Sequence, residues 1–168
     1  GELLEKESEL QISMNGQFQS FFKLGLTKRD RVGLRERPQD LSIDGNTTMF
    51  TEQQADFYFE LRPSATWYVS NYISYGDHID FDNNRLGKQS LIRPSFNWSL
   101  GKSLQFNLRH TYQYFEADKQ TLFTANLSDF RATYQFDRRQ SLRLILIYSD
   151  IERNQKNYYG NKITELSE

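Results

Sequence analysis

The sequence predicts an all-β fold, an antiparallel up-and-down β-barrel that spans a membrane. Three observations predict it: long segments in which apolar and polar residues alternate, connections that alternate between short and long, and a polar composition that is rich in aromatic residues. Together they are typical of a barrel with an apolar outer surface and a polar lumen. We expect about eight strands, forming a segment of a larger barrel.

The clearest alternation runs from Ser103 to Tyr114. Apolar and aromatic residues take every second position, with polar residues between them, and this period is that of a β-strand. A tilted strand needs roughly 9 to 11 residues to cross a bilayer, and tyrosine rings suit the headgroup level. The residues on the apolar side are Leu104, Phe106, Leu108, His110, Tyr112 and Tyr114.

The composition agrees with a barrel. Only 37% of the residues are hydrophobic and the mean hydropathy is -0.77, yet 15% are aromatic. In a barrel only alternate strand residues face lipid, so the whole chain stays polar. No apolar run approaches the roughly 18 residues of a transmembrane helix. The net charge of -1 favours no nucleic-acid partner, and the absence of Cys excludes thiol catalysis and disulfides.

Seven further segments show the same alternation, at about 5–14, 18–28, 48–61, 65–75, 90–100, 123–136 and 141–151. Asn15-Gly16 is a strong signal for the first hairpin turn, and Arg62-Pro63-Ser64 predicts another. Pro94 lacks a backbone donor, so we expect a bulge or a local irregularity there. The segment at 65–75 has aromatic residues on both faces, which leaves its orientation open.

The connections predict an outer-membrane barrel of a Gram-negative cell, with short periplasmic turns and long extracellular loops. Short connections are expected at 15–17, 62–65, 101–102 and 137–140, and long ones at 29–47, 76–89, 115–122 and after 151. Aromatic girdles are expected at both ends of the strands. Their members would be Trp67, Trp98 and Phe136 near the short turns, and Tyr75, Tyr112, Tyr114 and Tyr148 near the long loops.

The ends of the chain predict that residues 1–168 are one incomplete domain. The first strand would begin, and the eighth would end, on the long-loop side, whereas a complete barrel of this class has both termini in the periplasm. We therefore expect no pairing between the strand at 5–14 and the strand at 141–151. The expected partners are outer-membrane lipid and the remaining strands of the same protein.

Four segments resemble a known family. They are Asn46-Thr-Thr-Met-Phe-Thr-Glu52, Leu122-Phe-Thr-Ala-Asn-Leu-Ser-Asp129, Tyr134-Gln-Phe-Asp-Arg-Arg-Gln-Ser-Leu-Arg-Leu144 and Tyr148-Ser-Asp-Ile-Glu-Arg153. They are similar to the C-terminal β-barrel domain, of unknown function, of Gram-negative outer-membrane proteins that carry an N-terminal family-9-like carbohydrate-binding domain. The resemblance implies an envelope location and a glycan or a protein as candidate partner. It implies no activity, because the motifs are structural.

Charged residues are expected to line the lumen. Acidic residues share one strand and arginines share later strands, so a channel would carry a transverse field. These charges could equally pair and plug a closed lumen, since buried charges need partners. Both interpretations stay open. The residues are Glu52, Asp56, Glu60, Arg93, Arg109, Arg131 and Arg143.

No catalytic residue, cofactor or metal is predicted. Asp77, Asp80 and Asp82 are weak calcium candidates, and with His78 they could also supply rim catalysis, but a solvated loop is favoured. His110 could be half of a lipid-facing Ser-His pair, although a lone interfacial histidine is favoured.

The predicted function is therefore transport or secretion across the outer membrane through a polar, charged lumen, without enzyme activity. The alternative is a structural or binding barrel that displays extracellular loops or supports a partner protein without conductance. A soluble β-sandwich or lipocalin-like barrel is the third possibility, and its independence of detergent would distinguish it.

Overall fold

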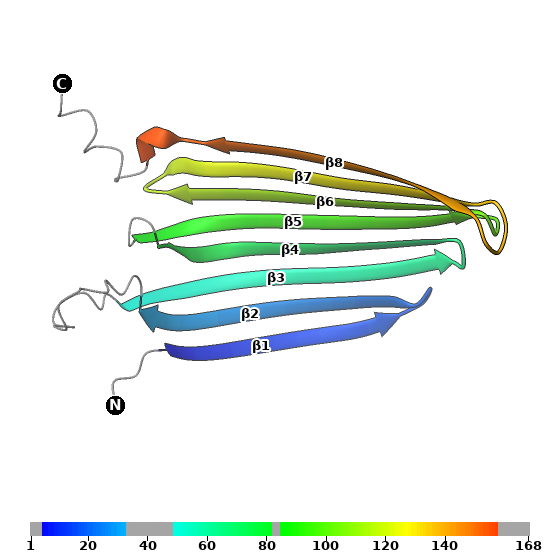
Figure 1. The fold of residues 1–168 in the computed structure, drawn as a ribbon. Helices are drawn as coiled ribbons and strands as arrows, with labels where there is room; N and C mark the ends of the chain where they lie inside the picture. The colour runs from blue at the N-terminus through cyan, green and yellow to red at the C-terminus, as the bar shows by residue number, and fades with distance from the viewer. Residues whose placement is uncertain (1–4, 33–48, 82–84, 158–168) are drawn as a thin grey trace, which may run out of the picture.

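The computed structural model describes residues 5–32, 49–81 and 85–157. These residues form one antiparallel sheet in which eight strands follow the order of the chain, each hydrogen-bonded to the next (Figure 1). The expected all-β meander of eight strands is confirmed. The strands are β1 Glu5–Gly16, β2 Ser20–Val32, β3 Met49–Ser64, β4 Trp67–Asp80, β5 Arg85–Leu100, β6 Leu104–Ala117, β7 Gln120–Gln135 and β8 Ser141–Arg153, followed by a 3-10 turn, η1 Gln155–Asn157.

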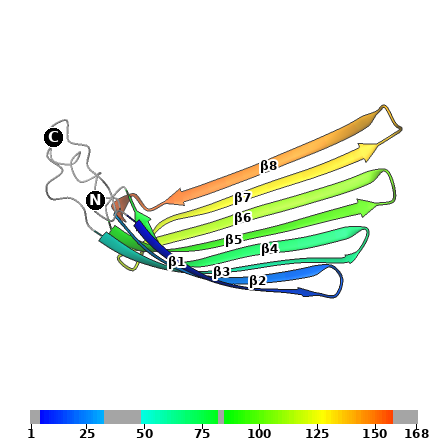
Figure 2. The same ribbon diagram turned by 90° about the horizontal axis from the view of Figure 1, so that it is seen from below.

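The sheet is a single curved layer and it is not closed (Figure 2). β1 and β8 lie at opposite edges and do not pair, as expected from the sequence. Both described ends of the chain lie at the same end of the sheet (Figure 1). The described part of the chain has no helix long and apolar enough to cross a membrane.

The strand register separates apolar from polar side chains. Residues that pair across strands point to the same side of a sheet, so an apolar row continues from strand to strand. One such row runs from β4 to β8 and consists of Val69, Phe96, Leu108, Phe130 and Leu146. A second row runs from β1 to β5 and consists of Ile12, Leu24, Phe57, Ile73 and Ile92. We call this side the apolar face and the other side the polar face.

The fourth strand follows the same rule. Trp67 and Val69 pair with Trp98 and Phe96, so they lie on the apolar face. Tyr68 and Tyr72 lie on the polar face because side chains alternate along a strand. The orientation that the sequence left open is therefore settled by pairing with β5.

The sheet has no central core, because the described residues form one layer. Large apolar side chains on the apolar face are exposed, for example Ile12 at 63% and Leu144 at 50%. Buried apolar residues instead include Ile79, Ala117 and Leu122, where β4 and β6 end and β7 begins. Packing against other parts of the described chain is therefore concentrated at one end of the sheet.

Two of the predicted turn segments lie in strands instead. Asn15-Gly16 belongs to β1 and pairs with β2, and the turn uses Gln17, Phe18 and Gln19. Phe18 and Gln19 supply the left-handed backbone there, with φ of 58° and 50°. Arg62-Pro63-Ser64 belongs to β3, where the register shifts between Leu61 and Ser64, because proline cannot donate to a ladder. The turn after it is 65–66.

Two of the predicted long connections are wrong. In place of a loop at 115–122, Asp118 and Lys119 form a two-residue turn with φ of 54° and 61°. Such left-handed pairs match the twist of a hairpin. In place of a loop at 76–89, β4 continues to Asp80 and β5 starts at Arg85. The remaining residues of the loop predicted at 29–47, from 33 onward, lie outside the described residues.

Ion pairs join β4 and β5 where they extend beyond the predicted strands. Arg85 Nε donates to Asp80 Oδ2 at 2.9 Å, and Lys88 Nζ lies 3.9 Å from Asp77 Oδ1. Opposite charges across neighbouring strands stabilise pairing that the local sequence does not favour. The two ends of the sheet therefore differ less in connection length than the sequence predicts.

Pro94 causes a local irregularity without a bulge. Pairing between β5 and β6 skips Arg93 and Pro94 and resumes at Ser95 in the same register. Pairing with β4 is continuous there, with Pro94 opposite Asn71. The missing donor therefore interrupts one ladder and leaves the two faces unchanged.

Gly76 is required where β3 meets β4. Its φ is 154°, and a Cβ atom there would collide with the Gln53 carbonyl oxygen and lie 2.6 Å from Gln54 Cα. We expect Gly76→Ala to destabilise the full-length protein by about 1–3 kcal/mol, the usual cost of overpacking. Urea unfolding followed by circular dichroism measures this.

Gly101→Ala is the matched control. Gly101 has φ of 61°, but a Cβ atom there meets nothing within 4 Å. Its cost should be that of left-handed backbone alone, about 1 kcal/mol. Equal unfolding free energies for the two variants would contradict the close approach at Gly76.

Candidate functional site

The polar face contains all seven residues that the sequence predicts for the lumen. Alternation along the paired strands puts the three acids of β3 and the arginines of β5 to β8 on this side. Within the described residues, none of these acids pairs with any of these arginines. The residues are Glu52, Asp56, Glu60, Arg93, Arg109, Arg131 and Arg143.

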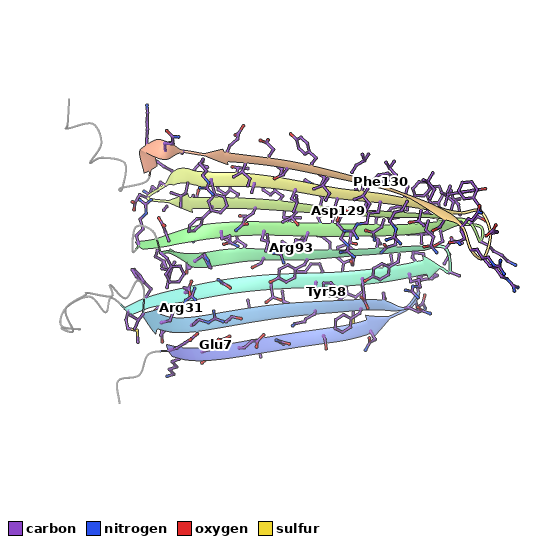
Figure 3. The ribbon with its side chains drawn as sticks, in the orientation of Figure 1. Glu7, Arg31, Tyr58, Arg93, Asp129 and Phe130 are labelled. Atoms are coloured by element: carbon purple, nitrogen blue, oxygen red, sulfur yellow. The ribbon has the colours of Figure 1, made fainter. Side chains whose placement is uncertain are left out.

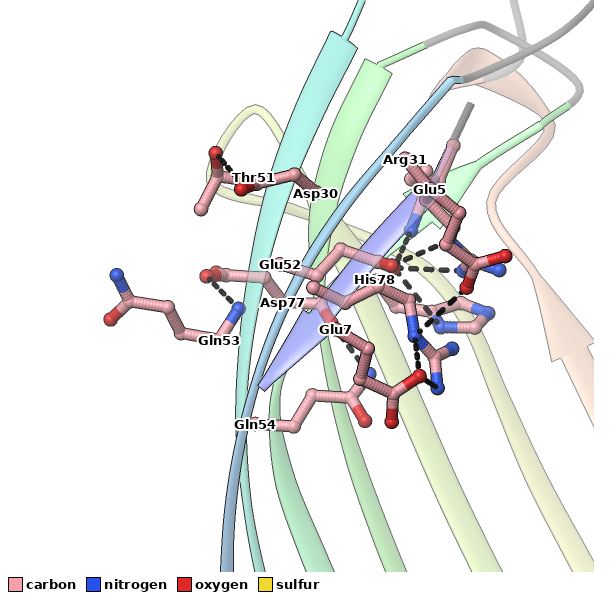
Figure 4. Close-up of polar contacts among 12 residues, drawn as sticks. Glu5, Glu7, Asp30, Arg31, Thr51, Glu52, Gln53, Gln54, Asp77 and His78 are labelled. Carbon is pink, nitrogen blue, oxygen red and sulfur yellow. Dashed lines mark hydrogen bonds and ion pairs between the residues drawn. The ribbon is translucent and has the colours of Figure 1, made fainter. Parts of the chain in front are cut away.

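Glu52 is the centre of a buried ion-pair cluster at one end of the sheet (Figure 4). Only 2% of the residue is exposed. Arg31 Nε donates to Oε2 at 2.6 Å, Arg31 Nη2 donates to Oε1 at 2.9 Å, and the Ile79 amide donates to Oε1 at 3.0 Å. A carboxylate held by a bidentate arginine and a backbone donor is well compensated for its burial. The cluster ties β2, β3 and β4 together.

His78 lies beside this cluster. Its Nδ1 is 3.7 Å from Glu52 Oε1, and its ring meets the Phe115 ring edge-on at 5.9 Å between centroids. His78 lies at the end of β4, two residues before Asp80, the last residue of the strand. Burial lowers the pKa of His78, Arg31 and Arg29 lower it further, and Glu52 opposes them. A neutral imidazole at pH 7 follows, so His78 adds no charge to the cluster.

Glu60 is held by phenols. The hydroxyls of Tyr58 and Tyr68 donate to Glu60 Oε2 at 2.7 and 2.8 Å. The Phe21 ring packs against Tyr58, with 6.1 Å between centroids. These aromatic residues on the polar face orient a carboxylate without neutralising it.

The four arginines predicted for the lumen are exposed, and three of them form no ion pair within the described residues. Arg131 makes two bonds to Asp129, from Nε to Oδ1 at 3.0 Å and from Nη2 to Oδ2 at 2.7 Å. Arg93, Arg109 and Arg143 form no ion pair with other described residues. Figure 3 labels Arg93 and Asp129 on the sheet. This half of the polar face therefore has an excess of positive charge, whereas β3 has three acids.

No family model, curated protein or solved structure matches this chain. Its function must therefore be inferred from the chemistry of its two faces.

The calcium candidates do not converge. Asp77 accepts a bond from the Gln53 amide at 3.1 Å, and Asp80 pairs with Arg85. They stand an odd number of residues apart on β4, so alternation points them to opposite faces. Asp82 lies outside the described residues. Within the described ranges, no three acidic or histidine side chains could hold a metal ion.

His110 is hydrogen-bonded to a serine on the apolar face. Its Nδ1 lies 2.8 Å from Ser128 Oγ, on the paired position of β7. Nucleophilic catalysis also needs a group that orients the other imidazole nitrogen. Within the described part of the chain, His110 makes no other hydrogen bond. The pair satisfies two polar groups across the strands.

The predicted girdle residues lie on the apolar face with one exception. Trp67 pairs with Trp98 at the turn end, while Tyr112 and Tyr114 lie toward the other end of β6. Tyr75 and Tyr148 also occupy apolar-face positions, opposite Ser90 and Ser128. Phe136 follows the end of β7, and its ring packs on Tyr134 with 4.8 Å between centroids.

Three partners were not foreseen from the sequence. Arg31 lies in a segment predicted as a loop, and neither its pairing with Glu52 nor the phenol bonds to Glu60 can be known without the register. No alternation marks Arg31, because residues 28–31 are all charged.

Glu52→Gln should loosen the end of the sheet. Removing the charge leaves the Arg31 guanidinium without its carboxylate, and a hydrogen bond to a charged group contributes about 1.5–3 kcal/mol. We expect the free energy of unfolding of the full-length protein to fall by that amount. Hydrogen exchange at the Ile79 amide, which donates to Glu52, should accelerate.

Glu7→Gln provides the control. Glu7 pairs with Arg29 at 2.8 Å on an exposed part of the same face. Exposed pairs contribute about 0–1 kcal/mol, so exchange at Ile79 should not change. Equal acceleration in both variants would show that the Glu52 cluster does not hold β4.

Proposed function

We propose that this chain forms part of the wall of an outer-membrane β-barrel, and that its polar face lines a lumen used for transport or secretion. The observation that carries the proposal is the separation of faces along β1 to β7, whose apolar rows continue onto β8. One face is apolar along most of its length and the other is polar and charged. Closed barrels in membranes have this arrangement.

The exposure of the apolar face supports a lipid environment. Among the described residues, Leu10, Ile12, Leu108 and Leu144 are all more than 40% exposed. Soluble monomers rarely expose contiguous apolar patches above a few hundred Å². Hydrocarbon tails would cover the face without a second protein layer.

The strand lengths support the same proposal. The strands have 12 to 16 residues, more than the roughly 9 to 11 that cross a bilayer. The surplus contains charged residues at the end opposite the Trp67–Trp98 pair, among them Asp80 and Arg85. These ends would extend beyond the lipid into water.

The edges of the sheet indicate what else the wall needs. Within the described residues, the outer edges of β1 and β8 have no strand beside them. Unpaired backbone groups in hydrocarbon cost several kcal/mol each, so further strands of the same protein would have to pair with both edges. We further propose that the membrane is the outer membrane of a Gram-negative cell, and that the chain is a C-terminal barrel domain of the family that it resembles.

One observation favours the alternative of a binding barrel without conductance. Ile145 and Ile147 lie on the polar face of β8 and are exposed. Apolar side chains are poorly suited to a water-filled lumen, whereas a bound molecule would cover them. A transport barrel would conduct ions, whereas a binding barrel would not.

Conductance of the full-length protein in planar bilayers tests the proposed function. A water-filled lumen should give stepwise ohmic channels. Asp56→Asn should shift the reversal potential in a salt gradient toward anions, because it removes a carboxylate from the polar face. Insertion without conductance would favour the binding barrel.

Leu108→Arg and Asn107→Arg test which face meets lipid. Leu108 is on the apolar face and Asn107 on the polar face, at adjacent positions of β6. Arginine at the midplane of a lipid face costs about 2–4 kcal/mol. We expect Leu108→Arg to reduce the folded, protease-resistant protein in the outer-membrane fraction and Asn107→Arg to have little effect. Similar losses in both variants would rule out this assignment.

A further inference from the structure

The separation of faces fails on β8. The polar face of this strand presents Ile145, Ile147 and Ile151, and Leu127 on β7 lies beside them. They are exposed by 47%, 66%, 55% and 44%, in that order. We call these four residues the isoleucine stripe. At about 3.3 Å per residue, it extends over roughly 20 Å along β8.

Arginines border the isoleucine stripe. Arg131 pairs with Ile145, and Arg109 shares a register row with Asp129 and Ile147. Paired positions on one face of a sheet bring the Cβ atoms of Arg131 and Ile145 to about 4.5–5.5 Å. Arg109 lies on β6, two strand spacings of about 4.8 Å from Ile147, with Asp129 of β7 between them. Arg143 precedes Ile145 by two positions on the same face of β8. Apolar and cationic groups therefore lie side by side on this part of the sheet.

The charge of this region is not balanced. Asp129 accepts hydrogen bonds from two guanidinium nitrogens of Arg131, Nε and Nη2. Arg109 and Arg143 form no ion pair with the described residues and are exposed. A guanidinium offers two parallel donors that match a carboxylate. The region can therefore accept an additional anionic group.

We propose that this surface binds organic anions in which a carboxylate is joined to an alkyl or aryl group. The carboxylate contacts Arg109 or Arg143, and the apolar part lies along the isoleucine stripe. The inference rests on the proposed lumen, and it names the class of molecule that this part of the lumen binds.

Charge complementarity selects this class over simpler ligands. An inorganic anion would satisfy the arginines but leave the stripe in water. A neutral hydrocarbon would cover the stripe but leave the guanidinium groups without a partner. A molecule with both parts satisfies both surfaces, and each buried methylene adds to its affinity.

Arginine modification in the full-length protein tests the proposal. The protein is placed in lipid nanodiscs and treated with phenylglyoxal, and modification of Arg109 and Arg143 is followed by mass spectrometry. Octanoate should protect them at roughly one tenth of the concentration that acetate needs, because burial of two methylene groups gives about that factor. Modification of Arg138, which lies in the turn 137–140 outside the proposed surface, serves as the internal control for the effective phenylglyoxal concentration.

Two variants separate the parts of the surface. Ile147→Ser should bring octanoate protection of Arg109 down to the acetate level. Leu144→Ser, on the opposite face of β8, should leave it unchanged. Both variants keep every arginine, so a folded protein is recognised by its unaltered phenylglyoxal pattern without ligand.

Equal protection by octanoate and acetate, or none by either, would overturn the proposal. The result is separable from conductance. A conducting protein without octanoate protection retains the proposed channel and loses this site. If octanoate protects the arginines of a protein that conducts no ions, the binding site is supported and the proposed channel is contradicted.

Discussion

Strand register is the constraint on which the rest of the structure depends. Because side chains alternate with a period of two, a slip by one residue would move every apolar side chain of a strand to the other face. The two register shifts lie near strand ends, between Leu61 and Ser64 and between Phe115 and Glu116. Pro94 lies in the middle of β5, and there the register does not shift. The central part of the sheet therefore keeps one register, and its two faces are continuous there.

Two of the acidic residues on the polar face bind partners on their own strand or on a neighbouring strand. Glu52 pairs with Arg31 of β2, and Glu60 accepts hydrogen bonds from Tyr58 of its own strand and Tyr68 of β4. The acids of β3 therefore do not depend on the arginines of the other half of the sheet. Among the described residues, Arg93, Arg109 and Arg143 form no ion pair, and both interpretations of the lumen stay open.

The strands and their faces could be predicted because alternation is a local signal, strong enough on β6 to orient its neighbours. The turns at 101–102 and 137–140 could also be predicted. Those at 17–19 and 118–119 could not, because non-glycine residues adopt the left-handed backbone there: Phe18, Gln19, Asp118 and Lys119. The ends of β4 and β5 are joined by the Asp80–Arg85 pair, which no local pattern reveals. The seven residues of the polar face were predicted as a set, but Arg31 and the phenol partners required knowledge of which strands lie side by side.

The meander has a consequence for how such a wall can change. Each strand pairs only with its neighbours in sequence, and β6 and β7 are joined by two residues. Insertion or deletion of one hairpin would preserve all other pairs, the direction of the flanking strands and the identity of both faces. Because the diameter of a barrel grows with its number of strands, the width of the proposed barrel would change in steps of two strands.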